Sequence, residues 1–269
     1  MRIEPLDDPA DPRFDAYRNI PDAALRARRG LFVAESRDVV RRLLTSRFRT
    51  RSALLTQPAL DSLRDALEAA PPAVVYLARH EVARAVVGYN FHRGCVALGE
   101  RGIEPLPEDI VDRPGPRIVL GLEDVSNPDN VGGIFRNARA LGADAVVLST
   151  GCADPLYRKS IRVSMGASLL LPFVHLEDWA AGLRRLRETG HVLVALTPDP
   201  AAADLAEPQP ALGHASRVVL LLGAEGHGLR AETRAAADLE LRIAMAAGAD
   251  SLNVATAAAI ALHRLQRAR

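Results

Sequence analysis

Residues 117–138 read RIVLGLEDVSNPDNVGGIFRNA and combine an apolar run, a polar turn and the beginning of a helix. The run at 117–124 is nearly continuous in Val, Leu and Ile, which is typical of a strand buried on both faces of a parallel sheet. Further runs of this kind follow at 145–150, 172–176, 191–197, 217–225 and 239–245. Helices are expected between these strands, and a last helix at about 252–268. The alternation predicts an α/β domain built on a parallel sheet.

A second, smaller α/β domain is expected before this one. Short apolar runs at 31–35, 52–56, 73–78 and 95–100 predict strands, and amphipathic stretches at 36–48, 59–70 and 80–87 predict helices. Four prolines and two glycines at 102–116 indicate a linker. The predicted division is therefore an irregular lead-in at 1–20, a small domain at 21–101, a linker at 102–116 and a larger domain at 117–269.

Composition excludes several classes of protein. The chain has 269 residues, 48% of them hydrophobic, and a net charge of +1, so it is no polycation. Two cysteines provide no disulfide framework, which favours a reducing, cytoplasmic location. The acidic, proline-rich beginning lacks the apolar core of a signal peptide, and no apolar run is long enough for a membrane span.

Arginine is concentrated in one part of the small domain. Nine arginines lie between Arg26 and Arg51, opposed only by Glu35 and Asp38. Such a surplus suits contacts with a phosphate backbone, but a solvated helix face explains it equally well. The residues proposed for RNA contact are Arg28, Arg29, Arg41 and Arg42. The segment GYNFHRG at 88–94 adds aromatic and basic groups of the kind that stack on bases.

Several well-known site signatures are missing from the sequence. There is no GxGxxG after a strand, no GxxxxGK[ST], no GxSxG, and no CxxC or HExxH. The sequence thus gives no support to a dinucleotide fold, a P-loop, a nucleophile elbow or a metal site, and no metal is expected.

Three segments carry polar and glycine residues that packing does not require. In the first, Asn127 to Arg136, Asp129 or Asn130 is expected to cap a helix whose first turns contain Gly132 and Gly133. Each glycine costs about 1 kcal/mol relative to alanine in a helix, which indicates a close approach by a backbone or a ligand.

The second and third segments follow later strands. Residues 222–228, LGAEGHG, form a glycine-rich turn directly after a buried strand, where open α/β sheets bind ligands. Residues 243–253, IAMAAGADSLN, end in a Ser-x-Asn that precedes the apolar last helix and by itself indicates only a cap.

In this order, the three segments resemble the motifs of the SpoU (TrmH-like) RNA ribose methyltransferases. The resemblance is strong over 117–268 and departs from the family at Ala244, where a proline is usual. The beginning of the small domain, FVAESRDVVRRL, is similar to the ribosomal-protein-like domain of many members. The family implies a deep trefoil knot, a homodimer formed through the C-terminal domain, and methylation of a ribose 2′-hydroxyl in tRNA or rRNA.

The resemblance also implies S-adenosylmethionine as the methyl donor. The residues expected to bind it are Leu196, Thr197, Leu222, Gly223, Gly228, Ile243, Met245 and Leu252. The expected catalytic residues are Arg136, Asn130, Glu225, Ser251 and Asn253. Arg136 lies nearest the 2′-hydroxyl by resemblance, with Asn130 and Asn253 holding it and the ribose, and Ser251 capping the last helix.

The acceptor of the hydroxyl proton stays open at this point. The family proposal makes Arg136 the base, yet a free guanidinium does not deprotonate at neutral pH. The alternative role of Arg136 is a clamp on a neighbouring phosphate, with that phosphate or Glu225 taking the proton. The alternative functions are a knotted base methyltransferase and a non-catalytic RNA-binding or assembly factor. The sequence does not separate a housekeeping role from antibiotic resistance.

Overall fold

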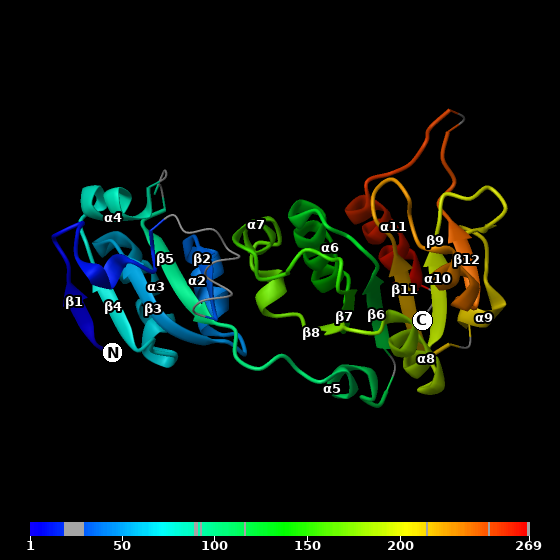
Figure 1. Ribbon diagram of the computed structural model, residues 1–269, viewed down its shortest axis with the longest axis horizontal. Helices are drawn as coiled ribbons and strands as arrows, with labels where there is room; N and C mark the ends of the chain where they lie inside the picture. Colours follow the sequence, from blue (N-terminus) through cyan, green and yellow to red (C-terminus); the bar gives the residue numbers. More distant parts are fainter. Residues whose placement is uncertain are drawn as a thin grey trace. The chain divides into compact units, whose positions relative to one another are not determined.

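The computed structural model describes residues 1–18, 30–88, 91, 93–115, 117–213, 215–246 and 248–267. It divides into two compact units (Figure 1). The first consists of Met1–Ile103 with Leu156–Leu170, and the second of Glu104–Pro155 with Leu171–Arg269. Within the described residues, no helix is long and apolar enough to cross a membrane.

The first unit is built on a mixed sheet. Its strands lie in the order β1 (Ile3–Pro5), β4 (Val74–Leu77), β3 (Arg49–Leu55), β5 (Cys95–Glu100) and β2 (Leu31–Glu35). β5 is antiparallel to β3 and β2, and the other pairs are parallel. The helices are α2 (Arg37–Leu44), α3 (Gln57–Ala69) and α4 (His80–Val87), with a 3-10 turn at Pro12–Phe14.

The sequence predicted an irregular lead-in at 1–20, but part of this segment has regular structure. Ile3 pairs with Val75, so β1 extends the sheet, and the buried Phe14 and Tyr17 belong to its core. The Tyr17 hydroxyl lies 2.6 Å from Ser52 Oγ. A three-residue edge strand that ends in proline is too short to show a strand pattern, which explains the error.

One segment of the sequence expected in the larger domain belongs to the first unit. Leu156–Leu170, which contains α7 (Arg158–Val163) and a 3-10 turn at Ala167–Leu169, follows the second strand of the larger sheet. Arg158 forms an ion pair with Glu35, and Arg42 donates to the Met165 carbonyl. The domain at 117–269 is therefore interrupted.

The second unit is built on an all-parallel sheet of seven strands. Their order is β10 (Ala203–Asp204), β12 (Leu239–Arg242), β9 (Val192–Leu196), β11 (Arg217–Leu222), β6 (Arg117–Leu122), β7 (Ala145–Ser149) and β8 (Phe173–Leu176). Every residue of β6 and β7 is buried, as the continuous apolar runs predicted. The α/β fold with a parallel sheet is thus confirmed. The short β10 lies between the predicted strands at 191–197 and 217–225, where the sequence shows no further apolar run.

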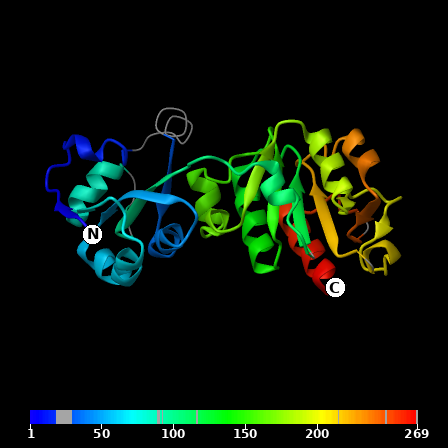
Figure 2. The same cartoon turned by 90° about the horizontal axis from the view of Figure 1, so that it is seen from below.

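Helices cover both faces of this sheet. They are α5 (Pro107–Val111), α6 (Pro128–Ala140), α8 (Trp179–Glu188), α9 (Pro210–Gly213), α10 (Ala231–Ala236) and α11 (Val254–Arg267). Figure 2 shows α6 and α11 side by side on one face and α8 and α10 on the other. α5 lies within the predicted linker and packs against α8, so 102–116 is not a simple connection.

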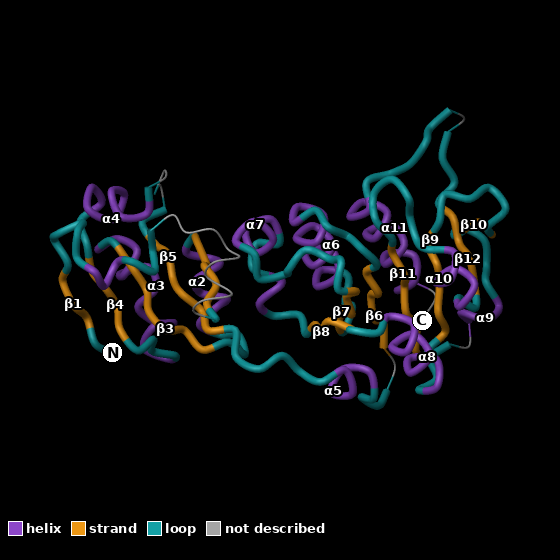
Figure 3. Tube along the Cα trace, viewed as in Figure 1, coloured by secondary structure: helices purple, strands orange, loops and turns teal. Residues whose placement is uncertain are grey.

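The order of the strands brings three loops together. β12 is last in the sequence, yet it lies beyond β9, and the chain must then cross the sheet to reach α11 beside α6. Figure 3 shows the long loop after β12 projecting before it turns back to α11. Because all strands are parallel, the loops after β9, β11 and β12 leave the same edge of the sheet.

Candidate active site

A pocket of about 810 Å³ lies where these three loops meet. That volume is within the range of small-molecule sites. All the residues that the sequence assigned to a cofactor line it: Leu196, Thr197, Leu222, Gly223, Gly228, Ile243, Met245 and Leu252. Glu225, Ser251 and Asn253 line it too. Residues separated by more than fifty positions in the sequence therefore face one cavity.

The glycines of the second segment have structural reasons that the sequence did not reveal. A Cβ on Gly223 would lie 2.1 Å from the backbone carbon of Gly228, so only glycine allows the loop to fold back on itself. The Gly228 N–H donates to the Ala224 carbonyl at 3.1 Å. Gly226 and Gly228 have φ values of 97° and 70°, which favour glycine. The loop is thus a tight turn with its backbone exposed to the pocket.

Asn253, and not Ser251, caps the last helix. Its Oδ1 accepts from the backbone N–H groups of Ala255 at 3.0 Å and Thr256 at 3.3 Å, where α11 begins. Ser251 is two residues earlier and exposed, so the predicted capping role of Ser251 is wrong. The asparagine is nearer the helix and presents the oxygen that the free N–H groups require.

The amide nitrogen of Asn253 connects the first and second segments. Nδ2 donates to Asn130 Oδ1 at 2.8 Å and to Glu225 Oε1 at 3.1 Å. Asn130 is only 5% exposed. The sequence predicted Asp129 or Asn130 as the cap of α6, and this prediction is wrong. Asn127 caps the helix by accepting from the Asp129 N–H at 2.9 Å. Asn130 is therefore free to face Asn253.

Close packing of α6 on α11 supports this contact. A Cβ on Gly133 would lie 2.9 Å from that of Ala255, and Asn137 Nδ2 donates to the Ala255 carbonyl at 2.8 Å. The prediction that a glycine in this helix marks a close approach is correct for Gly133, and the neighbour is a helix.

Arg136 stands apart from this arrangement. Its side chain is exposed and does not line the pocket. Within the part of the chain that the structure describes, no hydrogen bond or ion pair holds it. The pocket's own arginine, Arg234, is engaged by Asp199 at 2.7 Å and Glu240 at 2.6 Å. These acids raise the pKa of Arg234 above its ordinary value.

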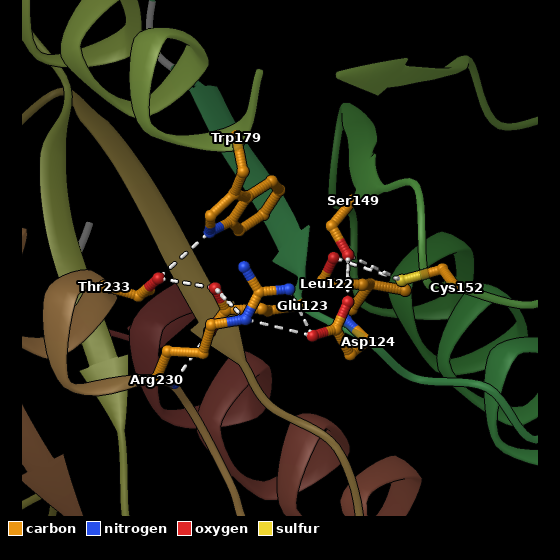
Figure 4. A network of polar contacts seen from close by, with 8 residues as sticks. All are labelled: Leu122, Glu123, Asp124, Ser149, Cys152, Trp179, Arg230 and Thr233. Carbon is orange, nitrogen blue, oxygen red and sulfur yellow. Dashed lines mark hydrogen bonds and ion pairs between the residues drawn. The ribbon is translucent and has the colours of Figure 1, made fainter. Parts of the chain in front are cut away.

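Sequence reasoning missed a second polar network, at the carboxyl ends of β6 and β7 (Figure 4). Glu123 is fully buried; its Oε1 accepts from Thr233 Oγ1 at 2.6 Å and its Oε2 from the Arg230 N–H at 2.8 Å. Asp124 accepts from Arg230 Nη2 at 2.5 Å and from Ser149 Oγ at 2.9 Å. The available signal was two acids at the end of an otherwise apolar strand.

The electrostatics of Asp124 reflect these contacts. Burial by itself raises the pKa of the Asp124 carboxyl, but hydrogen bonds from Arg230 and Ser149 outweigh it and leave the pKa below its ordinary value. A second cavity, of about 670 Å³, borders Glu123, Trp179, Arg230 and Thr233.

The residues proposed for RNA contact are only partly described. Arg28 and Arg29 lie outside the described residues, as do Tyr89 and His92. Arg41 forms an ion pair with Asp65 at 2.5 Å. Arg42 is engaged by the Met165 carbonyl, and Phe91 is 4% exposed within the core, so Phe91 packs and does not present a stacking face. In the described parts of the chain, no group of three or more His, Cys, Asp or Glu residues is placed to hold a metal ion.

Comparison with known proteins assigns this arrangement to a family. The model described as the SpoU rRNA Methylase family matches residues 117–263, more than half of the chain. The chain belongs to the SpoU family. One relative, an uncharacterized tRNA/rRNA methyltransferase of Mycobacterium bovis, is 43% identical over 99% of this chain and 93% of its own length.

Two further comparisons concern activity and fold. A 23S rRNA (guanosine-2′-O-)-methyltransferase of Ralstonia nicotianae is 32% identical over 77% of this chain and 83% of its own length. The crystal structure of an AdoMet-bound rRNA methyltransferase from Sinorhizobium meliloti has a TM-score of 0.84 with 24% identity, covering 98% of each chain. At that identity the likeness shows the fold alone.

Proposed function

We propose that this SpoU-family chain transfers a methyl group from S-adenosylmethionine to a ribose 2′-hydroxyl of rRNA or tRNA. The observation that carries the proposal is the pocket at the carboxyl edge of the sheet, lined by the whole predicted cofactor set and bordered by the Asn130–Asn253–Glu225 contacts. The guanosine-2′-O-methyltransferase named above supports the ribose as the target.

The lining of the pocket fits this methyl donor. Leu222, Ile243 and Leu252 provide apolar walls suited to an adenine ring, and the exposed backbone of the glycine loop provides hydrogen-bonding groups. Asp250 adds a carboxylate for the donor's ammonium group. When bound, S-adenosylmethionine supplies an activated methyl group on a sulfonium, and dry apolar walls favour a transfer that disperses this charge.

The chain's own residues orient the acceptor and remove its proton. Asn253, held by Asn130 and by its helix cap, fixes the carboxylate of Glu225 at the rim of the pocket. A carboxylate so placed is suited to accept the hydroxyl proton. Arg136, exposed and without a partner among the described residues, is suited to clamp an RNA phosphate and so orient the ribose. Ser251 lies at the same rim and contributes a hydroxyl to the substrate.

The path of the chain supports a trefoil knot. β12 lies beyond β9, and the segment 243–253 must return past the glycine loop to reach α11 beside α6. Knots are rare because they require one segment to thread through another. The proposed thread is this segment, which places Ile243 and Leu252 around the cofactor.

A homodimer formed through α11 is part of the proposal. Much of the apolar surface of α11 is already covered within the chain, since Val254, Ala258, Ala261 and Leu262 are buried. Ile260 and Leu252 remain 41% and 39% exposed. Exposed aliphatic side chains beside a site are suited to a symmetric partner.

The N-terminal unit is proposed to bind RNA without taking part in the chemistry, because every pocket residue comes from the second unit. Since Arg41 and Arg42 already have protein partners, exposed arginines such as Arg37 and Arg51 are better suited to phosphate contacts. The enzyme would work in the cytoplasm, where rRNA and tRNA are found.

The decisive experiment is the identification of the product. Purified protein is incubated with total RNA and methyl-labelled S-adenosylmethionine, and the RNA is digested to nucleosides for mass spectrometry. We expect a nucleoside methylated on its ribose. A methyl group on the base would indicate a base methyltransferase, and S-adenosylhomocysteine binding without transfer to any RNA would indicate a non-catalytic factor.

A further inference from the structure

The second polar network is joined to the glycine loop through a single residue. The loop 223–229 leaves β11 at Leu222 and ends at Arg230. The backbone N–H of Glu123 donates to the Leu222 carbonyl at 2.9 Å, and the side chain of Glu123 accepts from the Arg230 N–H at 2.8 Å. Both ends of the loop are therefore held by Glu123, the residue that directly follows β6.

The burial of Glu123 makes these contacts obligatory. Its exposed fraction is 0%, and a buried carboxylate is costly unless it is paired and hydrogen-bonded. Each of its two oxygens has a donor: Thr233 for Oε1 and the Arg230 backbone for Oε2. The Arg230 guanidinium provides a counter-charge at 3.7 Å. An arrangement of this kind has little freedom to move without losing a contact.

Neighbouring residues stiffen the same turn. Asp124 has φ of 56°, in the left-handed region that residues other than glycine seldom adopt. It is kept there by Ser149 and by both Nε and Nη2 of Arg230. On the other side, Trp179 Nε1 donates to Thr233 Oγ1 at 3.1 Å, as Figure 4 shows. Such a backbone conformation persists where surrounding contacts over-determine it.

We infer that Glu123 is a positioning residue that fixes the exit of the glycine loop and thereby sets the affinity for the methyl donor. Glu123 does not line the proposed donor pocket, whereas every residue of the loop from Gly223 to Leu229 does. A shift at Arg230 is passed directly to Leu229 and Gly228. The effect on donor affinity rests on the proposed function, but the effect on the loop does not.

Two substitutions test the inference, with a matched control. Glu123→Gln removes the negative charge that strengthens both contacts, and its NH2 group takes the place of the oxygen that accepts from the Thr233 hydroxyl. Thr233→Val removes the hydroxyl donor and leaves the size of the side chain nearly unchanged. Glu232→Gln removes an exposed acid from the same helix and is the control. If Glu123→Gln does not fold, Thr233→Val decides.

The first measurement is hydrogen exchange without any ligand. We expect the amides of 223–230 to exchange at least tenfold faster in Glu123→Gln and Thr233→Val than in Glu232→Gln, with α6 and α11 unchanged. A loop that exchanges at the control's rate in both variants overturns the inference. This measurement decides the positioning role even if the protein does not bind a methyl donor.

The second measurement is donor affinity. With S-adenosylhomocysteine in calorimetry, we expect the Kd to rise about tenfold in Glu123→Gln, while the KM for RNA stays unchanged. A residue that only stabilised the fold would change both or neither. If the wild type fails to bind S-adenosylhomocysteine, the proposed function falls. If it binds and Glu123→Gln binds equally well, the effect on donor affinity falls and the proposed function stands.

Discussion

At the scale of single residues, the side chain of Asn253 combines two tasks. Its oxygen caps α11, and its nitrogen donates to Asn130 and Glu225. We expect Asn253→Ala to lose both tasks. Loss of the cap should lower the free energy of unfolding by about 1 kcal/mol, and loss of the donor should remove most of the turnover. Asn253→Asp keeps the capping oxygen but sets an acceptor against Asn130 Oδ1 and the Glu225 carboxylate, so its turnover should fall as in Asn253→Ala. Equal turnover in Asn253→Asp and the wild type would remove the amide contacts from the mechanism.

Arg136 provides the complementary case, because its side chain is exposed and outside the pocket. We expect Arg136→Ala to lower methyl transfer by about a hundredfold or more, the lower range for a lost proton-transfer or orienting group. Its melting temperature and its affinity for S-adenosylhomocysteine should not change. Arg139→Ala, also exposed and one turn further along α6, is the control. A variant at Arg136 with substantial turnover would exclude it from the reaction.

At the scale of secondary-structure elements, Gly133 determines how closely α6 approaches α11. The Cβ of Ala255 lies only 2.9 Å from the place of a new Cβ at Gly133, and it cannot rotate away. Overpacking costs about 1–3 kcal/mol, and better helix propensity returns about 1 kcal/mol. We therefore expect Gly133→Ala to lower the free energy of unfolding in urea. Adding Ala255→Gly should recover part of the loss, and strictly additive effects of the two substitutions would contradict the close contact.

Three basic side chains lie in a row at the amino ends of β6, β11 and β9. Arg117 pairs in register with Arg217, and His191 directly precedes Val192, the partner of Val218. Burial, followed by the charge of Arg217, lowers the pKa of His191 from 6.5 to about 4. His191 is therefore neutral in the folded protein at pH 5, whereas an unfolded histidine is mostly protonated there.

The sign of the pH dependence follows from this difference. Below pH 6.5 the unfolded chain binds a proton that the folded chain does not, so the free energy of unfolding falls as the pH is lowered from about 6.5 to about 4. We expect urea denaturation to show a smaller loss between pH 7 and pH 5 in His191→Gln than in the wild type. Identical losses would show that His191 titrates normally.

At the scale of the whole molecule, the exposed Ile260 tests the proposed dimer. An aspartate in the middle of an apolar interface is strongly unfavourable, because a charge would be buried without a partner. We expect Ile260→Asp to sediment as a monomer at micromolar concentration and to lose activity. Ala231→Asp, an exposed position on the opposite face of the sheet, should leave the dimer intact. A wild-type protein that sediments as an active monomer would contradict the dimer.

The sequence by itself determined the parallel sheet and which segments meet at its carboxyl edge. Continuous apolar runs such as 117–122 and 145–149 reflect burial on both faces, which is a local property of each strand. The three motif segments follow strands, so their meeting at one edge could be foreseen. All eight residues assigned to the cofactor indeed line one pocket.

Only the tertiary structure decided which partner each polar group takes. Arg42 binds the Met165 carbonyl, Asn253 takes the cap expected of Ser251, and Glu123 holds the two ends of a loop a hundred residues away. Residues 156–170 join the first unit for the same reason. Hydrogen bonds of this kind form only where two distant segments are placed relative to each other to within a few tenths of an ångström. Sequence periodicity records which side of an element is buried, but not what lies against it.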